Sequence, residues 1–416
     1  MTAPGTAAAG ESLAAFGVLA LWFWRLRARP ATAGQPAPVV WLVRRTHVLP
    51  VALQGVLYVY WMLYSEPARV HASVVLIHIC FGVLFETLLG FQRDGAWRIS
   101  LAAVPAAVSM NLFIWYEAER SWVPFVLLAF GLGAKRFILW QGRHLFNPSA
   151  LAIALGALAA SVAPSVFRYE DIASAFSFAP NMLELVFLAS LVPLALLRTA
   201  PVTVGGFLAM YVLHGFHFTP LESPQSFFVP TAQGSEPLPF PFWAPWLLTL
   251  TLFAGDPATV PRTAPGRLLN GLIMGTGLVG FSYLLYALGG SDFFAKALAV
   301  VTANTLVPLQ DRIGRRIAAL LPVLERPRAN WVWLGLYVAM LVGNLSAPFK
   351  QKMFEVNGEH IPERPRVWDE GGGGCASQRC QRVFFRPFSF VAEARLWAAS
   401  DEPRPEGASS MATAIL

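Results

Sequence analysis

The chain has 416 residues, of which 56% are hydrophobic and only 13% charged, and its mean hydropathy is +0.52. Such a composition excludes an ordinary soluble enzyme of this length and predicts an integral membrane protein whose first partner is the lipid bilayer. The net charge of +7 does not indicate a nucleic-acid partner, because no zinc-binding spacing and no platform of aromatic and basic residues accompanies it.

Apolar segments recur along the chain at lengths close to the roughly 20 residues that a helix needs to cross a bilayer. We predict spans near 12–24, 46–64, 71–90, 99–116, 122–134, 148–163, 181–197, 202–217, 243–254, 268–288, 293–310 and 330–346. Several of these are shorter than a full crossing. The sequence therefore predicts an all-α, polytopic membrane bundle of about 10 to 12 transmembrane helices over residues 1–346.

The Lys and Arg content of successive predicted loops alternates between high and low. One set of loops contains Arg25, Arg27, Arg29, Arg44, Arg45, Arg93, Arg98, Lys135, Arg136, Arg143, Arg198, Arg262, Arg267, Arg312, Arg315, Arg316, Arg326 and Arg328. The opposite loops before the tail contain only Arg69, Arg120 and Arg168. Since basic loops stay on the cytoplasmic side, we expect a multi-pass protein of the bacterial inner (plasma) membrane with the first set inside.

The two ends of the chain differ in character. Arginines follow the first apolar segment instead of preceding it, so we interpret that segment as a retained anchor and not as a signal peptide. Residues 347–416 are rich in proline, glutamate, arginine and glycine, which predicts an irregular extramembrane tail. Twelve crossings place this tail outside, whereas its own basic residues are also compatible with eleven crossings and a tail inside.

Cysteine is sparse. Cys375 and Cys380 lie in the tail with four residues between them, and this spacing fits a small disulfide, half of a metal site or two free thiols. His360 is the only histidine of the tail, so we predict no metal site.

Two short apolar segments are each followed by a helix-start signal. Asn147-Pro148 follows segment 122–134, and Asp256-Pro257 follows segment 243–254. Asn or Asp is a favoured N-cap, and proline is favoured at the first helical position. A helix start of this kind offers free N–H groups to a phosphate or an anionic ring, and paired broken helices mark binding sites in transporters. The simpler interpretation, that both signals only begin a helix, stays open.

Three segments carry a resemblance to a known family. They are Arg143-His144-Leu145-Phe146-Asn147-Pro148-Ser149-Ala150, Asp256-Pro257-Ala258-Thr259-Val260-Pro261 with Gly266-Arg267 after it, and Ala303-Asn304-Thr305-Leu306-Val307-Pro308-Leu309-Gln310-Asp311-Arg312. In this order they resemble motifs of the RnfD/NqrB family, the membrane subunit of Rnf electron-transport complexes and of sodium-translocating NADH:quinone reductases. The resemblance covers residues 120–316.

The resemblance implies a urea-transporter-like helical plan with two repeated halves, other membrane subunits as partners, electron transport and ion translocation. It also implies flavin. The expected cofactor-binding residues are Lys135, Arg136, Arg143, His144, Asn147, Pro148, Asp256, Pro257, Thr259 and Arg262, with the basic side chains available to the phosphate. No nicotinamide-binding motif is present, so that chemistry would belong to a partner. The sequence does not decide whether the chain is itself an enzyme, nor its electron donor, its acceptor or its ion.

The chain departs from the family in the proline-rich outer loop 218–242. The family esterifies FMN to a threonine there, whereas this chain aligns Glu236 with that position and has Thr231 out of register. A carboxylate cannot form the phosphoester. Two possibilities for the cofactor remain: FMN or riboflavin held non-covalently, or the loss of flavin. Divergent relatives also occur beside biosynthetic gene clusters, including those for enediynes. The alternative function is therefore a channel-like or transporter-like protein without redox chemistry, accessory to such a cluster.

Polar residues within the apolar segments are further candidates. His71 and His78 share a helical face, as do His214 and His217, which is a loose match to paired haem ligands; buried, bonded histidines are the commoner outcome. Glu184, Lys296 and Asn304 indicate an ion path or, near helix ends, snorkelling side chains.

Overall fold

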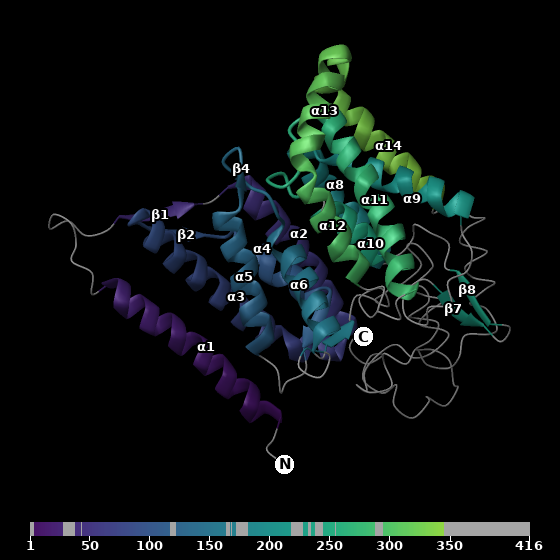
Figure 1. Cartoon of the computed structure of the whole chain (residues 1–416). Coiled ribbons are helices and arrows are strands. Elements are labelled where there is room, and N and C mark those ends of the chain that lie inside the picture. Colours follow the sequence, from purple (N-terminus) through teal and green to yellow (C-terminus); the bar gives the residue numbers. More distant parts are fainter. Residues whose placement is uncertain are drawn as a thin grey trace. The chain divides into compact units, whose positions relative to one another are not determined.

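The computed structural model of the chain is mostly helical, in agreement with the all-α prediction (Figure 1). It describes residues 4–27, 38–42, 44–116, 122–163, 167, 169–171, 182–217, 228–231, 234–237, 244–253, 255–287 and 294–344. The predicted tail, with Cys375 and Cys380, lies outside these residues. The chain divides into two compact units: unit 1 is Met1–Gly55 with His71–Glu170, and unit 2 is Val56–Val70 with Asp171–Leu416.

Unit 1 contains the elements of the first half of the chain. They are α1 (Pro4–Arg27), β1 (Val39–Leu42), the first part of α2 (Arg45–Tyr64), most of α3 (Glu66–Asp94), β2 (Trp97–Ser100), α4 (Ala103–Asn111), β3 (Ile114–Tyr116), α5 (Trp122–Phe137), β4 (Leu139–Trp140), β5 (Arg143–His144), α6 (Pro148–Val162) and β6 (Tyr169–Asp171). β1 pairs with β2 in parallel, Val39 opposite Trp97, and β3 pairs with β6.

A tight hairpin connects α5 to α6. β4 and β5 are antiparallel, with Leu139 opposite His144, and only Gln141 and Gly142 separate them. Both residues have positive φ, 48° and 78°, as a two-residue type I′ turn requires. Gly142 adopts this conformation without strain because it lacks a Cβ. The turn returns the chain directly to the start of α6.

Unit 2 contains the remaining elements. They are α8 (Met182–Leu197), α9 (Ala200–His217), β7 (Phe228–Thr231), β8 (Gly234–Pro237), α10 (Ala244–Leu248), the π-helix η3 (Thr249–Phe253), α11 (Ala264–Ala287), α12 (Ala295–Thr305), α13 (Val307–Leu320), the short 3₁₀-helix η5 (Pro322–Glu325) and α14 (Ala329–Asn344). The end of α2 and the first residues of α3 also belong to unit 2.

Glycines bring the backbones of α9 and α11 into direct contact. A Cβ on Gly271 would overlap the carbonyl oxygen of Val202, and a Cβ on Gly275 would overlap that of Gly206. Gly205 of α9 faces the backbone of α11 in the same way. Gly271 and Gly275 have the four-residue spacing of close helix pairs in membranes. Gly271 meets Val202 and, one turn further along both helices, Gly275 meets Gly206, so α9 and α11 run parallel.

The π-helix η3 lies against α9. A π-turn shifts the backbone register and leaves a carbonyl oxygen without its usual partner. Thr203 of α9 donates its hydroxyl to the carbonyl oxygen of Leu250, at 3.1 Å, and Gly206 leaves room for the Leu250 side chain. The irregular helix is therefore stabilised by a side chain of its neighbour.

The predicted spans agree with the helices in place but not always in length. In the described part of the chain, three helices are long and apolar enough to cross a membrane: Thr46–Tyr64, Glu66–Asp94 and Ala264–Leu285. Pro148–Ala160, Glu184–Leu197, Ala200–Met210 and Ala329–Met340 are shorter apolar helices.

Two of the predicted spans are wrong as single helices. Segment 99–116 contains only the nine-residue α4 between two strands. Segment 293–310 is divided at Leu306, where α12 ends and α13 begins. Leu306, which links α12 to α13, has αR dihedral angles. Pro308 lies in the first turn of α13, the part of a helix in which proline is tolerated.

The α9–α11 contact predicts a large difference between two glycines of one helix. We expect Gly271→Ala to destabilise the protein by about 1 to 3 kcal/mol or more, because the backbones must separate. Gly280→Ala, where a Cβ meets nothing within 4 Å, should be neutral or stabilising by up to about 1 kcal/mol. Thermal unfolding of both variants in one detergent measures this, and equal midpoints would contradict the packing.

Candidate functional site

The predicted cofactor-binding residues are divided between the two units. Lys135, Arg136, Arg143, His144, Asn147 and Pro148 belong to unit 1, and Asp256, Pro257, Thr259 and Arg262 belong to unit 2. Each group is described within its own unit.

The basic residues at the end of α5 are bound to acidic residues of α3. Lys135 donates to Glu86 at 2.7 Å, and both side chains are largely buried. Arg136 forms an ion pair with Asp94, and Arg93 donates to the carbonyl oxygen of Arg136 at 2.6 Å. Burial, and then the neighbouring Arg93, lower the pKa of the Arg136 guanidinium, while Glu86 raises it. These charges hold the ends of α3 and α5 together.

The start of α6 is closed by its own cap. The side-chain oxygen of Asn147 accepts from the N–H groups of Ser149, at 3.1 Å, and Ala150, at 3.2 Å, and from the hydroxyl of Ser149 at 2.8 Å. Pro148 occupies the first helical position, as predicted. A Cβ on Gly131 would overlap the carbonyl oxygen of Pro148, so α5 touches the first turn of α6.

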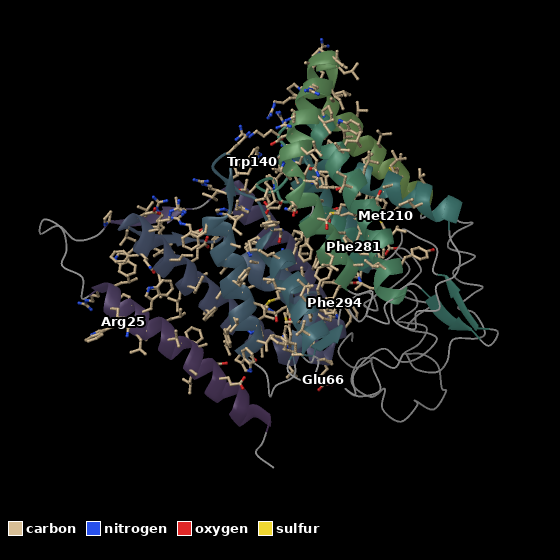
Figure 2. All side chains as sticks on the ribbon, viewed as in Figure 1. Arg25, Glu66, Trp140, Met210, Phe281 and Phe294 are labelled. Carbon is tan, nitrogen blue, oxygen red and sulfur yellow. The ribbon has the colours of Figure 1, made fainter. Side chains whose placement is uncertain are left out.

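Arg143 and His144 form strand β5 of the hairpin between α5 and α6, and both side chains are half-buried. Trp140, opposite Arg143, is labelled in Figure 2. The type I′ turn places these two basic residues immediately before the capped start of α6.

The second motif does not begin a helix. Asp256 accepts from the N–H of Ala258 at 3.0 Å, and its carbonyl oxygen accepts from the N–H of Thr259 at 3.1 Å. Residues 255–260 are therefore turns, and α11 starts only at Ala264. The prediction that Asp256-Pro257 caps a helix is wrong, because the aspartate bonds to a local turn as Asx residues often do.

The N–H groups at the true start of α11 are bonded within the chain. Thr263 Oγ1 accepts from Gly266 N at 3.2 Å, and Glu325 accepts from Ala264 N at 2.7 Å. The fully buried Asp311 of α13 accepts from Arg262 N at 2.8 Å. Two carboxylates of the chain thus lie where the positive end of the helix dipole favours an anion.

This arrangement joins two of the motifs that were separate in the sequence. A Cβ on Gly314 would overlap Thr263 Oγ1, and Asn270 Nδ2 donates to Gln310 Oε1 at 2.9 Å. Arg267 donates to the carbonyl oxygens of Pro261, at 2.9 Å, and of Arg198, at 2.6 Å. The segments around Asp256 and Asp311 consequently form one cluster, which we call the motif cluster: residues 255–270 with Gln310, Asp311 and Gly314.

A phosphate at either helix start would have to displace internal bonds. Asn147 occupies two N–H groups of α6, and Thr263 with the two carboxylates occupies those around the start of α11. Lys135 and Arg136 already neutralise carboxylates. In this structure these residues do not form an open phosphate-binding site, and we derive no chemical step through a flavin.

Unit 1 contains a polar cluster of which only the two histidines were candidates from the sequence: His71, His78, Asn111, Gln54 and Ser109. Asn111, the last residue of α4, lies with its amide oxygen 3.0 Å from His71 Nε2 and its amide nitrogen 3.1 Å from His78 Nδ1. His78 Nδ1 also lies 3.3 Å from the amide oxygen of Asn111, so it accepts from the amide nitrogen or donates to the amide oxygen according to its tautomer. Asn111 thus links the two imidazoles through hydrogen bonds.

Apolar and aromatic groups surround this polar cluster. The ring of His71 stacks on Trp115 with centroids 4.1 Å apart, and that of His78 meets Phe125 edge-on. Gln54 Nε2 of α2 donates to Ser109 Oγ of α4 at 2.6 Å. The seven-residue histidine spacing was visible in the sequence, but Asn111 gave no signal of its own within segment 99–116.

The remaining candidates give less information. β7 and β8 form an antiparallel hairpin with Glu236 opposite Val229, whereas residues 232–233 and the side chains of His214 and His217 lie outside the described part. Glu184, Lys296 and Asn304 are all buried in unit 2. Among the described residues, no group of three or more His, Cys, Asp or Glu side chains could hold a metal.

No protein-family model, no curated protein and no solved structure matches this chain. The functional argument therefore depends on the contacts within the two units.

The cap of α6 predicts a test of Asn147. We expect Asn147→Ala to lower the free energy of unfolding by about 1 kcal/mol and to speed hydrogen exchange at Ser149 and Ala150, because their N–H groups lose an acceptor. Asn147→Asp keeps the acceptor and should preserve both properties. Hydrogen exchange followed by mass spectrometry measures this; unchanged protection in the alanine variant would contradict the cap.

Proposed function

We propose that the chain is a multi-pass protein of a bacterial inner membrane and acts as the membrane subunit of an Rnf/Nqr-like electron-transport system. The observation that carries the proposal is the motif cluster, in which segments about 50 residues apart share the contacts Arg262 N to Asp311 and Asn270 to Gln310. Contact between them supports a common architectural origin for the motifs that the resemblance rests on.

The distribution of side chains supports insertion in lipid. Along α8, Leu188, Val192 and Leu196 form an exposed stripe at four-residue spacing, about half of each side chain being accessible. Interior positions carry polar residues instead, such as Gln54 and Asn111, each only 2% exposed. A water-soluble bundle places these classes the other way round. Apolar faces toward the solvent and bonded polar groups inside are what a hydrocarbon solvent favours.

The basic residues support the proposed orientation within each unit. In unit 1, Arg93, Lys135 and Arg136 meet at the ends of α3 and α5. In unit 2, Arg267 binds the carbonyl oxygen of Arg198 beside the start of α11. In each unit, two of the loops that the charge rule assigns to the cytoplasm therefore lie in contact, as the proposal requires.

The proposal implies other membrane subunits as partners and a nicotinamide chemistry that resides outside this chain. Its cofactor would be FMN or riboflavin held without a covalent bond, because Glu236 aligns with the esterified threonine of the family, and the phosphate of FMN would have to displace the internal bonds described above. When bound, such a group supplies one- and two-electron transfer. Lys135, Arg136 and the two helix starts are engaged as described, so the contribution of this chain is the rigid scaffold around the motif cluster.

The absorption spectrum of the detergent-purified protein tests the proposal. We expect flavin bands near roughly 370 and 450 nm that are lost from the protein after acid precipitation, as for a flavin without a covalent link. Bands that stay with the precipitate would contradict the role of Glu236. A protein without any chromophore, purified together with its membrane partners, would overturn the electron-transport proposal.

The polar cluster of unit 1 favours a second candidate function, a channel-like or transporter-like protein. The nine-residue α4 ends at Asn111 within the helices of unit 1, and broken helices of this kind carry ion and solute sites in transporters. Histidines inside membrane segments are typical of proton pathways, and Asn111 holds the imidazoles of His71 and His78 beside one another through hydrogen bonds.

Proton flux into proteoliposomes tests the second candidate. We expect a pH-sensitive dye inside the vesicles to report uptake that Asn111→Leu reduces at least about tenfold, because the variant separates the two imidazoles. Cys80→Ala, exposed on the same helix two residues after His78, is the matched control and should keep the flux. Equal flux in the leucine variant and the wild type would reject this pathway.

A further inference from the structure

We infer that α13 and the turn after it form a binding surface for the headgroups of anionic membrane lipids. This basic arm, residues 307–331, contains Arg312, Arg315, Arg316, Arg326 and Arg328. The inference rests on the proposed insertion in a membrane but does not depend on redox chemistry or transport.

The helix α13 is divided into two faces. Val307, Gln310, Asp311 and Gly314 are buried against unit 2, and they recur at the three- and four-residue spacing of one helical face. Arg312, Arg315 and Arg316 are exposed and share the opposite face by the same spacing. The folded core therefore fixes the direction in which these arginines project.

The guanidinium groups of the basic arm have no ion-pair partner among the described residues, in contrast to Arg136, which binds Asp94. The arm has two acidic residues of its own. Asp311 is fully buried and accepts from Arg262 N, and Glu325 accepts from Ala264 N. Both carboxylates thus bond toward the start of α11, which leaves the outward charge of the arm positive.

Apolar side chains accompany the arginines. Leu320 is 79% exposed, and Leu321 and Val323 in the following turn are about half exposed. Trp331, at the start of α14, is 66% exposed. Figure 2 shows nitrogen-tipped side chains projecting from α13 and from the turn beyond it. Exposed leucines and a tryptophan beside arginines suit the boundary between lipid headgroups and acyl chains.

A lipid surface fits these features better than an acidic protein. A protein partner would cover the apolar turn and pair the arginines in fixed geometry, whereas lipid headgroups supply a layer of negative charge beside hydrocarbon. Each basic residue near such a surface contributes about 1 kcal/mol. Three arginines on one face are therefore enough for preferential retention of anionic lipid.

Binding of phosphatidylglycerol to the purified full-length chain in a neutral detergent tests the inference by native mass spectrometry, with phosphatidylcholine as reference. We expect Arg312→Gln/Arg315→Gln/Arg316→Gln to weaken phosphatidylglycerol binding on the order of 100-fold at low salt. The matching lysine triple variant keeps the charge and should retain most of the binding. The control Arg25→Gln/Arg27→Gln/Arg69→Gln removes the same charge from three exposed arginines elsewhere and should retain the binding.

The outcomes distinguish the lipid-binding inference from the proposal of membrane insertion on which it rests. Equal binding by the glutamine triple variant and the wild type overturns the lipid surface, even when the protein resists alkaline carbonate extraction from membranes. Release of the wild-type protein by carbonate overturns membrane insertion itself. Loss of a co-purifying protein from the glutamine variant, with lipid binding unchanged, overturns the inference in favour of an acidic protein partner.

Discussion

Unit 2 depends on the contact between the backbones of α9 and α11, because glycines remove the side chains that otherwise keep two helices apart. Gly271 and Gly275 fix how far α11 lies from α9 and at which height. The start of α11 and its bonds to Asp311 and Glu325 follow from that position. The π-helix η3 depends on the same helix pair, since Thr203 bonds to Leu250 and Gly206 makes room for it. The motif cluster is therefore a consequence of close helix packing as much as of its own residues.

Both units satisfy polar groups from within. Asn147 caps α6, Thr263 caps α11, and Asn111 binds two histidines and a carbonyl oxygen of its own helix. This pattern is expected where water cannot reach unpaired groups, because each unpaired group then costs a large part of its hydration energy. It also changes the interpretation of a helix start as an anion seat, since a start that is capped internally is already neutralised.

The sequence was sufficient to predict the helical class and the places of most described helices, because apolar segments of helix length dominate the composition. It was also sufficient for the cap at Asn147, where asparagine, proline and a small-residue helix are adjacent. It was insufficient at Asp256, because aspartate before proline suits a turn and a helix start equally well. The helix begins eight residues later, at Ala264. The break at Leu306 and the short α4 were missed for a related reason: apolarity alone does not show where a helix ends. The partners of Asn111 come from a different helix, so no local pattern contained them.

The residues that make this chain resemble Rnf/Nqr membrane subunits are mainly residues that bind the backbone. Asn147, Asp311 and Arg267 each satisfy main-chain N–H or carbonyl groups, and Gly266 allows α11 to touch α13. These roles are needed by the fold whether or not a flavin is present, so their retention supports an architecture more strongly than it supports a reaction. In the proposed resemblance, Glu236 aligns with the position at which the family attaches its cofactor. Under the proposal, the scaffold and the attachment of flavin would vary independently of each other, so the chemistry of the chain must be decided from the bound chromophore and not from the motifs.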